Sequence, residues 1–257
     1  MKRIKYHAAV DTNLLHIFQS GIQEWYRQEG RNLPWRHTTD PYHILVSEIL
    51  LHQTTVKTVE PVYRRFLERF PSVTDLARSS LEEVKAITDP LGYKIRGKWL
   101  HDIAGVVVNE FDGTFPNSLE ELLRLPGVGR YTAGAILSFA YGYDAPILDT
   151  NVNRLIGRYF AINYKNPQAE VKHQLWSVAE AIVPSGQARE FNNALMDMGA
   201  LICTASKPKC LVCPVAAGCA MLTIPNQKHA NFAAEERVQY RIRSALEKGT
   251  GHALEPD

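Results

Sequence analysis

The positions of the cysteines say most about the chemistry of this chain. There are only four cysteines, and they fall within seventeen residues: Cys203, Cys210, Cys213 and Cys219. Gaps of six, two and five residues suit a loop that wraps thiolates around one metal centre. Lys207 and Lys209 lie in the same loop and offset the charge of four thiolates. Zinc and an iron–sulfur cubane both take four cysteines, so the spacing predicts a metal site without choosing between them.

Two glycines one residue apart stand in Leu125-Pro126-Gly127-Val128-Gly129-Arg130, directly before a predicted helix. They allow a tight turn in which backbone N–H groups approach a partner closely. The helix start adds a partial positive charge, so a phosphate oxygen is the natural ligand. On this segment alone, a simple turn between two helices is an equally good interpretation. A P-loop is disfavoured, because no strand precedes the glycines and no Lys-Ser/Thr follows them.

Two acidic residues, Glu48 and Asp149, stand in contrasting surroundings. Glu48 lies in an apolar helical segment beside Ile49, where loss of solvent would raise its pKa and keep a proton available. Asp149 precedes a predicted helix, whose N–H groups would keep it ionised. Taken alone, a Glu in such a helix is most often a rim residue, and an Asp in such a place is most often an N-cap.

Helices must position these residues. Apolar residues recur at steps of three and four, Gly, Pro and Asn separate the segments, and no stretch alternates with period two. Ser80-Leu81-Glu82-Glu83 is a capping box. These patterns predict an all-α protein of about ten short helices. The clearest expected helices span residues 58–70, 98–111, 118–123, 132–141, 152–159, 171–183, 190–203 and 232–246.

The composition is that of an ordinary globular protein, with 45% hydrophobic and 22% charged residues, which excludes a disordered chain. A net charge of +2 neither requires nor excludes a nucleic-acid partner. No apolar run approaches the roughly 18 residues of a membrane span, and the charged first residues are not followed by the apolar core of a signal peptide. We therefore expect a cytoplasmic protein with no membrane partner and no disulfides; nucleoid association in a prokaryote is an expectation that depends on the family resemblance given next.

Three features together resemble one family. Leu125-Pro126-Gly127-Val128-Gly129 is similar to the hairpin of the helix-hairpin-helix (HhH-GPD) DNA glycosylase superfamily, and residues 147–152 resemble the segment that carries its aspartate. The cysteine spacing is similar to the [4Fe–4S] loop of the endonuclease III and MutY branches. The strongest local resemblance is to MutY-type adenine DNA glycosylases, through Leu33-Pro34-Trp35, Leu91-Gly92-Tyr93, and residues 46–54, 131–136 and 196–200.

The resemblance implies a monofunctional glycosylase of base excision repair, which flips a mispaired base out of DNA and hydrolyses its N-glycosidic bond. Glu48 would protonate adenine N7 and later activate water, while Asp149 would stabilise the oxocarbenium ion. Glycoside hydrolysis uses a similar pair. Tyr131 stands where bifunctional endonuclease III-like enzymes have an attacking lysine, so no AP-lyase activity is expected. Asn151 is the remaining residue of the expected catalytic group.

The same resemblance places several residues at the DNA. Gln53, expected on the same helix as Glu48, and Tyr93 are expected wedges that enter the duplex. The expected hairpin contacts are Leu125, Gly127, Gly129, Arg130 and Thr132. Further cations are candidate phosphate contacts, although each is as readily interpreted as part of a solvated face: Arg64, Arg65, Arg69, Lys94, Arg96, Lys98 and His101.

The resemblance also implies a cofactor and an architecture. The four cysteines would hold a [4Fe–4S] cluster with a structural and DNA-docking role. Two helical lobes would enclose the active site in the cleft between them. The expected parts are residues 1–36 (N-terminal part of the cluster lobe), 37–145 (six-helix barrel with the helix-hairpin-helix), 146–223 (cluster lobe) and 224–257 (basic tail). The expected partner is double-stranded DNA with a mismatch or a damaged base, bound by a monomer.

The chain departs from the MutY pattern at His52, Lys94, Thr150 and Asn153. Only 38 residues follow Cys219, so we expect no C-terminal domain that recognises 8-oxoguanine. Thymine/uracil mismatch glycosylases share this short architecture.

Three readings of the activity follow. Matches around Gln53, Tyr93 and residues 132–136 favour adenine opposite guanine or 8-oxoguanine as the excised base. Thymine or uracil opposite guanine is the alternative. A non-catalytic DNA-binding protein is a second alternative, against which the joint presence of two carboxylates and Tyr131 argues.

Overall fold

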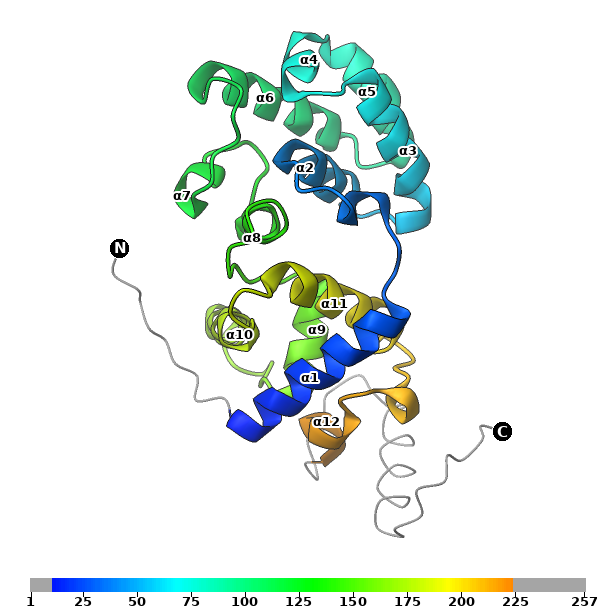
Figure 1. The fold of residues 1–257 in the computed structure, drawn as a ribbon, viewed down its shortest axis with the longest axis vertical. Coiled ribbons are helices and arrows are strands. Elements are labelled where there is room, and N and C mark those ends of the chain that lie inside the picture. Colours follow the sequence, from blue (N-terminus) through cyan, green and yellow to red (C-terminus); the bar gives the residue numbers. More distant parts are fainter. Residues whose placement is uncertain (1–10, 224–257) are drawn as a thin grey trace. The chain divides into compact units, whose positions relative to one another are not determined.

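The computed structural model describes residues 11–223, and within them every regular element is a helix (Figure 1). The predicted all-α class is confirmed. Twelve α-helices and four short 3-10 helices occur in this range, rather than about ten helices. The helix expected over residues 232–246 lies outside the described residues. The chain divides into two compact units, of which one is Asn32–Ile147 and the other combines residues 11–31 with residues 148–223.

The unit Asn32–Ile147 is built around one buried helix, α2. Every residue of α2 from Ile44 to Leu50 is buried, and α2 packs against α3, α6 and α8. The elements of this unit are η1 (Pro34–Arg36), α2 (Pro41–Leu50), α3 (Val56–Arg69), α4 (Val73–Arg78), α5 (Leu81–Thr88), η2 (Asp89–Leu91), α6 (Ile95–Glu110), α7 (Leu119–Leu122) and α8 (Arg130–Phe139).

Capping side chains fix where the helices of this unit begin. The Asp40 carboxylate accepts a hydrogen bond from the Tyr42 N–H at 2.8 Å and begins α2, with Pro41 at its first position. The predicted capping box at the start of α5 is confirmed. There the Ser80 hydroxyl accepts from the Glu83 N–H at 3.2 Å, and the Glu83 carboxylate accepts from the Ser80 N–H at 3.0 Å.

Helix α6 begins at Ile95, three residues before the predicted start at residue 98. Gly97 hides this first turn in the sequence, because glycine is a poor helix former. The structure shows why glycine stands there. A Cβ atom at Gly97 would lie 2.5 Å from the Thr88 Oγ1 atom, so its absence lets α5 and α6 pack closely.

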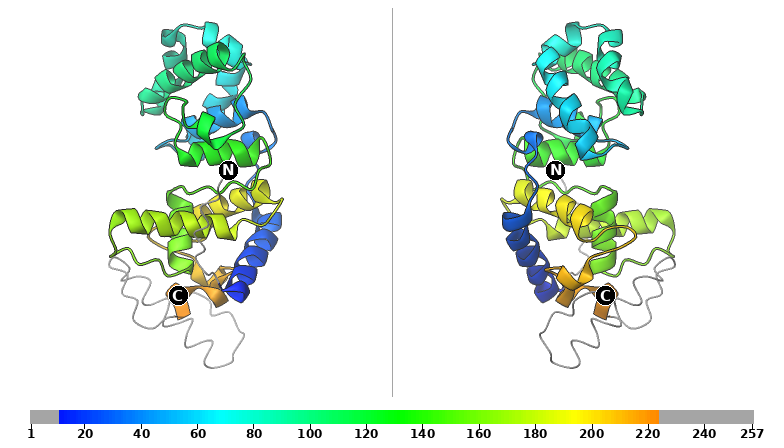
Figure 2. Two further views of the ribbon diagram at one scale, coloured as in Figure 1. Left: turned by 90° about the vertical axis from the view of Figure 1, so that its left-hand side faces the viewer. Right: turned by 90° about the vertical axis from the view of Figure 1, so that its right-hand side faces the viewer.

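The second unit holds α1 (Thr12–Glu29), α9 (Thr150–Tyr159), α10 (Gln168–Ile182), α11 (Ala188–Leu201), η3 (Cys210–Val212), η4 (Ala216–Gly218) and α12 (Ala220–Thr223). Helix α11 packs against both α1 and α9 (Figure 2). An aromatic core joins them. The fully buried ring of Phe18 on α1 lies 4.5 Å from the Tyr159 ring and 6.3 Å from the Phe191 ring, measured between centroids.

No helix within residues 11–223 has both the length and the apolar character needed to cross a bilayer.

Candidate functional site

Glu48 is a buried carboxyl group at the centre of the first unit. Its side chain lies on α2 among apolar neighbours, and the residue is 3% exposed. The Tyr131 hydroxyl, at the start of α8, donates a hydrogen bond to the Glu48 Oε2 atom at 2.6 Å. The backbone at Pro146 passes close to α8 and helps to place this helix, since a Cβ atom at Gly134 would lie 2.3 Å from the Pro146 carbonyl oxygen. The structure therefore joins two of the predicted site residues, and Glu48 is not a rim residue.

The position of Gln53 differs from the prediction. Helix α2 ends at Leu50, so Gln53 is not on the same helix as Glu48 but in the exposed turn that follows it. Its φ of 53° is in the left-handed region, which a side chain of this type rarely adopts. The apolar run continues past the helix end, and for that reason the sequence pattern does not show where α2 stops.

Arg96 explains why α2 stops. Its guanidinium donates to the carbonyl oxygens of Leu50 at 2.6 Å and His52 at 2.7 Å, and to the Thr54 hydroxyl at 3.0 Å. It also donates to the Tyr93 carbonyl oxygen at 3.0 Å. The side chain is fully buried. The prediction that Arg96 contacts phosphate is therefore wrong: this cation caps the helix end and ties the turn to Tyr93.

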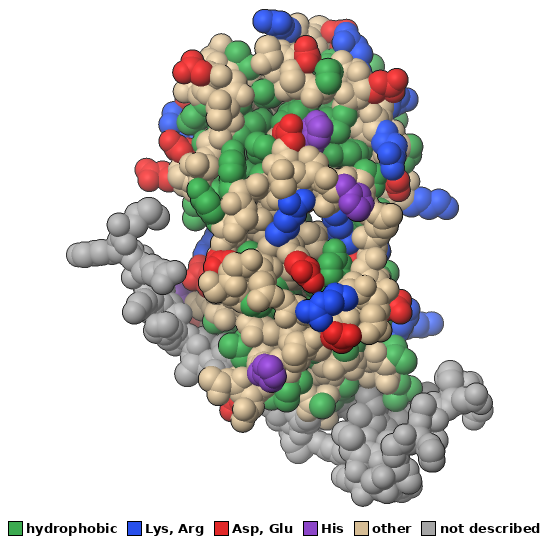
Figure 3. Space-filling model, viewed as in Figure 1, with side chains coloured by type: hydrophobic (Ala, Val, Ile, Leu, Met, Phe, Trp, Pro, Cys, Tyr) green, Lys and Arg blue, Asp and Glu red, His purple; other side chains and the backbone are tan. Residues whose placement is uncertain are grey.

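Several of the other candidate cations are engaged with neighbouring acids. Arg64 pairs with Glu60 at 3.0 Å, while Arg69 pairs with Glu83 and Lys98 with Asp102. On the face drawn in Figure 3, Lys and Arg side chains are interspersed with Asp and Glu. Lys94 and Arg130 are exposed. Lys94 follows Tyr93 in the turn before α6, and Arg130 follows the glycine hairpin.

Asp149 lies in the second unit, where it caps α9. Its Oδ1 atom accepts from the Val152 N–H at 2.7 Å, and its Oδ2 atom accepts from the Asn151 carboxamide at 2.9 Å. Burial raises the pKa of Asp149, while these hydrogen bonds lower it by a smaller amount. The predicted cap is present, and its hydrogen bonds favour the ionised form, while desolvation opposes them and is the larger of the two effects on the pKa.

Arg154 holds Asn151 in place and was not found by sequence reasoning. Its Nη2 atom donates to the Asn151 Oδ1 atom at 2.9 Å and to the Gly199 carbonyl oxygen at 2.7 Å. Its Nε atom donates to the Cys203 carbonyl oxygen at 2.7 Å. One guanidinium thus joins the start of the cysteine loop to the carboxamide that contacts Asp149. The signal in the sequence was the spacing of three between positions 151 and 154, which places both residues on one helix face.

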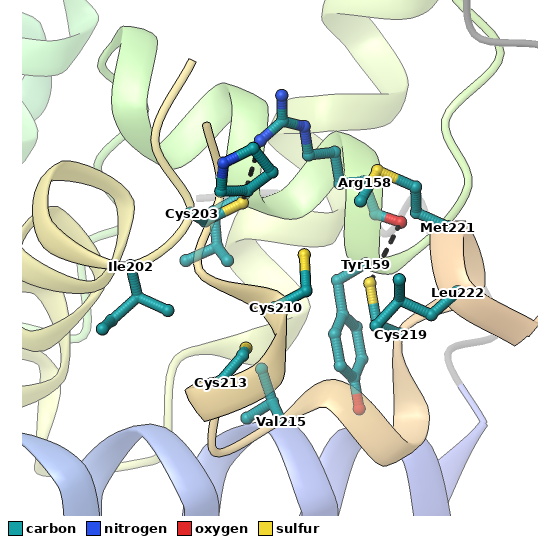
Figure 4. A pocket seen from close by; sticks show the side chains of 12 residues that line it. Arg158, Tyr159, Ile202, Cys203, Cys210, Cys213, Val215, Cys219, Met221 and Leu222 are labelled. Carbon is teal, nitrogen blue, oxygen red and sulfur yellow. Dashed lines mark hydrogen bonds between the residues drawn. The ribbon is translucent and has the colours of Figure 1, made fainter. Parts of the chain in front are cut away.

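The four cysteines converge on one cavity, as Figure 4 shows. Its walls are otherwise mostly apolar and include Leu155, Tyr159 and Leu222. The Arg158 guanidinium donates to the Cys203 sulfur at 3.4 Å, and the Cys219 thiol donates to the Arg158 carbonyl oxygen at 3.8 Å. The arrangement is an apolar cradle of sulfur ligands with the Arg158 guanidinium beside it.

The donor set fits a bound metal centre, because four sulfur ligands line one mostly apolar cavity. Burial raises the pKa of Cys213 to about 11 and that of Cys219 to about 12. A bound metal would therefore supply the positive charge that stabilises the thiolates.

Two family models match the chain. The model described as HhH-GPD superfamily base excision DNA repair protein matches residues 46–181, and the iron–sulfur binding domain of endonuclease III matches residues 203–219. The chain belongs to the HhH-GPD superfamily. The predicted family, helix-hairpin-helix fold and [4Fe–4S] cofactor are confirmed.

Relatives within the HhH-GPD superfamily carry two activities in their names. An adenine DNA glycosylase of Buchnera aphidicola subsp. Baizongia pistaciae is 43% identical over 79% of this chain, and the match spans 58% of the relative's length. A thymine/uracil-DNA glycosylase of Pyrobaculum aerophilum is 42% identical over 77% of this chain and 88% of its own. The structure of a thermostable thymine-DNA glycosylase superposes with a TM-score of 0.76 at 37% identity, covering 81% of this chain and 96% of that one.

Replacing Cys210 by Ser is expected to lower the iron content and the thermal stability of the purified protein. Serine is a poor ligand for iron, and cluster binding contributes to folding. We expect a brown protein with four irons for the native chain, a near-colourless variant, and a Tm lower by roughly 10 °C. Iron and sulfide analysis together with thermal unfolding measures this. Leu211→Ala, at an exposed position in the same loop, is the control and should keep its iron; equal iron loss in the control, or full iron in the Cys210 variant, contradicts the assignment.

Proposed function

We propose that this protein is a monofunctional DNA glycosylase that removes adenine mispaired with guanine or 8-oxoguanine. The observation that carries the proposal is the buried Glu48 carboxyl group with the Tyr131 hydroxyl 2.6 Å away. An acid of this kind, sheltered from water and oriented by one donor, is what protonation of a departing base requires. The adenine DNA glycosylases among the relatives support adenine as the base.

The proposed reaction is hydrolysis of the bond between the base and deoxyribose. Glu48 donates a proton to the base nitrogen as that bond breaks, so the base leaves neutral. Asp149 stabilises the positive charge that develops on the sugar. Water then adds to the sugar carbon, and Glu48 takes the proton that this water loses. Asn151 holds the Asp149 carboxylate through its carboxamide.

Tyr131 supports a glycosylase without lyase activity. A lysine at this place would attack the sugar as an amine, form a Schiff base and lead to strand cleavage, whereas a phenol cannot form a Schiff base. Tyr131→Lys is therefore expected to make the protein trappable on substrate DNA by borohydride. The control is Tyr63→Lys in the buried core of the same unit, which should give no trapped complex. A folded Tyr131→Lys protein that never traps would show that residue 131 is not at the sugar.

The hairpin and the two turns beside it are the proposed DNA-binding surface. Backbone N–H groups at Gly127 and Gly129, with the start of α8, suit a phosphate, and Arg130 adds a cation. Leu125 and Thr132, which the family resemblance also places at the DNA, are buried, and we leave them out of the proposed surface. We propose Gln53 and Tyr93 as the wedges that replace the flipped base. Among the other cations, Lys94 remains our candidate for a phosphate contact.

Thymine or uracil opposite guanine is the second candidate substrate. It is supported by two thymine/uracil-DNA glycosylases among the relatives, which are 42% and 38% identical to this chain. Excision of a pyrimidine would use Asp149 in the same way, because the sugar develops the same charge.

A panel of labelled duplexes distinguishes the candidates. Duplexes that contain A·G, A·8-oxoguanine, T·G or U·G are incubated with the holoprotein, and strand breaks are counted with and without hot alkali. We expect breaks only after alkali, and fastest on an adenine substrate. Fastest cleavage of the T·G or U·G duplex would mean that thymine or uracil, and not adenine, is the excised base. No excision of any base, by a protein that binds the duplexes, would leave a non-catalytic DNA-binding protein.

We also propose that the unit around α2 is the helix-hairpin-helix barrel of residues 37–145, and that the flanking residues 1–36 and 146–223 form the cluster lobe. The proposed partner is mismatched or damaged double-stranded DNA, bound by one copy of the chain in the compartment that holds the genome. Analytical ultracentrifugation of the complex tests the stoichiometry; two copies on one mismatch would contradict it.

A further inference from the structure

Trp99 on α6 contacts three separate turns of the Asn32–Ile147 unit. Its ring packs edge-on against the His52 ring, with centroids 5.9 Å apart, and against the Tyr93 ring at 5.7 Å. Gly127 of the hairpin lies directly on the same indole. A Cβ atom there would be 2.5 Å from the Trp99 Cδ2 atom and 2.6 Å from its Cγ atom. These contacts join the turn after α2, the turn before α6 and the glycine hairpin.

The contact at Gly127 needs a glycine for two reasons. Its φ is 73°, a conformation that residues with a side chain rarely adopt. The indole also fills the space in which a Cβ atom would stand. The second reason is independent of the turn geometry, so the glycine is matched to the tryptophan and not only to the hairpin.

Arg96 completes the arrangement one helical turn earlier. Positions 96 and 99 share a face of α6, because residues three apart are neighbours on a helix. The buried guanidinium of Arg96 ties the carbonyl oxygens of His52 and Tyr93 to α6, as described above. Two of the three turns are therefore held at the backbone by Arg96 and at the side chain by Trp99, while the hairpin is held by Trp99.

We propose that Trp99 is a positioning residue that couples the hairpin to the two turns carrying Gln53 and Tyr93, so that phosphate binding at the hairpin and entry of the wedges into the duplex act as one event. The proposal rests on the proposed function for its DNA ligand. Its structural part, the coupling of three turns through one ring, does not depend on the substrate.

The first test needs no DNA. Hydrogen exchange is measured on the holoprotein for peptides that cover residues 51–55, 91–94 and 125–129. Trp99→Leu is expected to increase exchange about tenfold in all three peptides, and Trp99→Phe, which keeps a ring, much less. Trp35→Leu is the matched control: it removes another ring from the same unit, one that packs on Tyr63. If Trp35→Leu loosens the three turns equally, or if Trp99→Leu loosens only one of them, the proposal is wrong.

The second test is a double-mutant cycle on binding of a duplex that carries a tetrahydrofuran abasic-site analogue. Gln53→Ala perturbs the wedge, and Arg130→Ala perturbs the hairpin. Distant, independent sites give effects on Kd that multiply. We expect the double variant in the native background to depart at least about fivefold from the product of the two single effects, and to match that product in the Trp99→Leu background. Effects that multiply in both backgrounds overturn the coupling.

The outcomes separate this proposal from the proposed function. If the native protein excises no base, the proposed function is wrong. Both tests of Trp99 still apply in that case, because one uses free protein and the other uses binding to a duplex that cannot react. If the native protein excises a base but hydrogen exchange in the Trp99→Leu protein is unchanged, the proposed function stands and the proposed role of Trp99 is wrong.

Discussion

Replacing Glu48 by Gln is expected to reduce base excision about a thousandfold while leaving the protein folded and able to bind DNA. The carboxamide has the same shape as the carboxyl group, and its oxygen still accepts the hydrogen bond that Tyr131 donates to Glu48 at 2.6 Å. What is lost is the transferable proton, and general acid catalysis of this kind contributes roughly 10²–10⁴ in rate. Single-turnover excision on the fastest duplex of the panel measures the loss, and binding of the tetrahydrofuran duplex measures what is retained.

Glu60→Gln is the matched control for this prediction. Glu60 lies on the neighbouring helix α3 and pairs with Arg64 at the surface, so its replacement removes a carboxylate from the same unit without touching α8. Exposed ion pairs contribute little to stability, and the control should excise at the native rate. A Glu48→Gln protein that also excises at the native rate would mean that another group protonates the base. A parallel loss of excision and of binding would mean that residue 48 supports the fold instead.

The helices could be read from the sequence because their signals are local. Ser80 predicts a helix start within four residues, and the structure contains the predicted cap. The sulfur ligands were equally local, since four cysteines in seventeen residues leave few other interpretations. By contrast, the partner of Glu48 is 83 positions away in the sequence. Only the resemblance to a family, and not any periodicity, drew attention to Tyr131.

The positively charged residues of the sequence were the least informative signal, because they did not show which side chains are free to contact phosphate. Arg96 and Lys94 stand two residues apart, and the sequence presents both equally as candidate phosphate contacts or as parts of a solvated face. One is fully buried among carbonyl oxygens, and the other is exposed. A sequence does not show which of two cations has acceptors within reach, because three of the four acceptors of Arg96 come from residues 50–54 and the burial of its side chain is a property of the packed unit. The contacts by which Arg96 ends α2 are not visible in the sequence either, and for that reason the prediction placed Gln53 on that helix.

Replacing Asp149 by Asn is expected to slow excision strongly and to change how stability depends on pH. Loss of the negative charge removes the stabilisation of the sugar cation, which we expect to cost about 10²–10³ in rate. The effect on stability follows from the burial that raises the Asp149 pKa above its ordinary value of 3.8. A raised pKa means that the ionised form is less favourable in the folded protein than in the unfolded chain, so ionisation costs stability as the pH rises above 3.8.

Asparagine cannot ionise, so the variant escapes this cost. The stability of Asp149→Asn relative to the native protein should therefore increase as the pH rises from about 4 to 7. The new amide donor would face the Asn151 carboxamide, whose own donor contacts Asp149 at 2.9 Å, and this contact is unfavourable. The cost of this contact is the same at every pH. It therefore changes the stability difference between the variant and the native protein equally at pH 4 and at pH 7, and it cancels when the two differences are compared. Chemical denaturation of both proteins at a series of pH values gives the comparison.

Asp11→Asn provides the matched control in the same unit. Asp11 caps α1 much as Asp149 caps α9, accepting from the Asn13 N–H at 2.8 Å and from the Leu14 N–H at 3.0 Å, but it is exposed. The Asp11 variant shows what the exchange of a capping carboxylate for an amide does by itself, and it should excise normally. If the stability of Asp149→Asn relative to the native protein falls with rising pH, then the hydrogen bonds from Val152 and Asn151 outweigh desolvation, and Asp149 is a carboxylate that the fold prefers ionised.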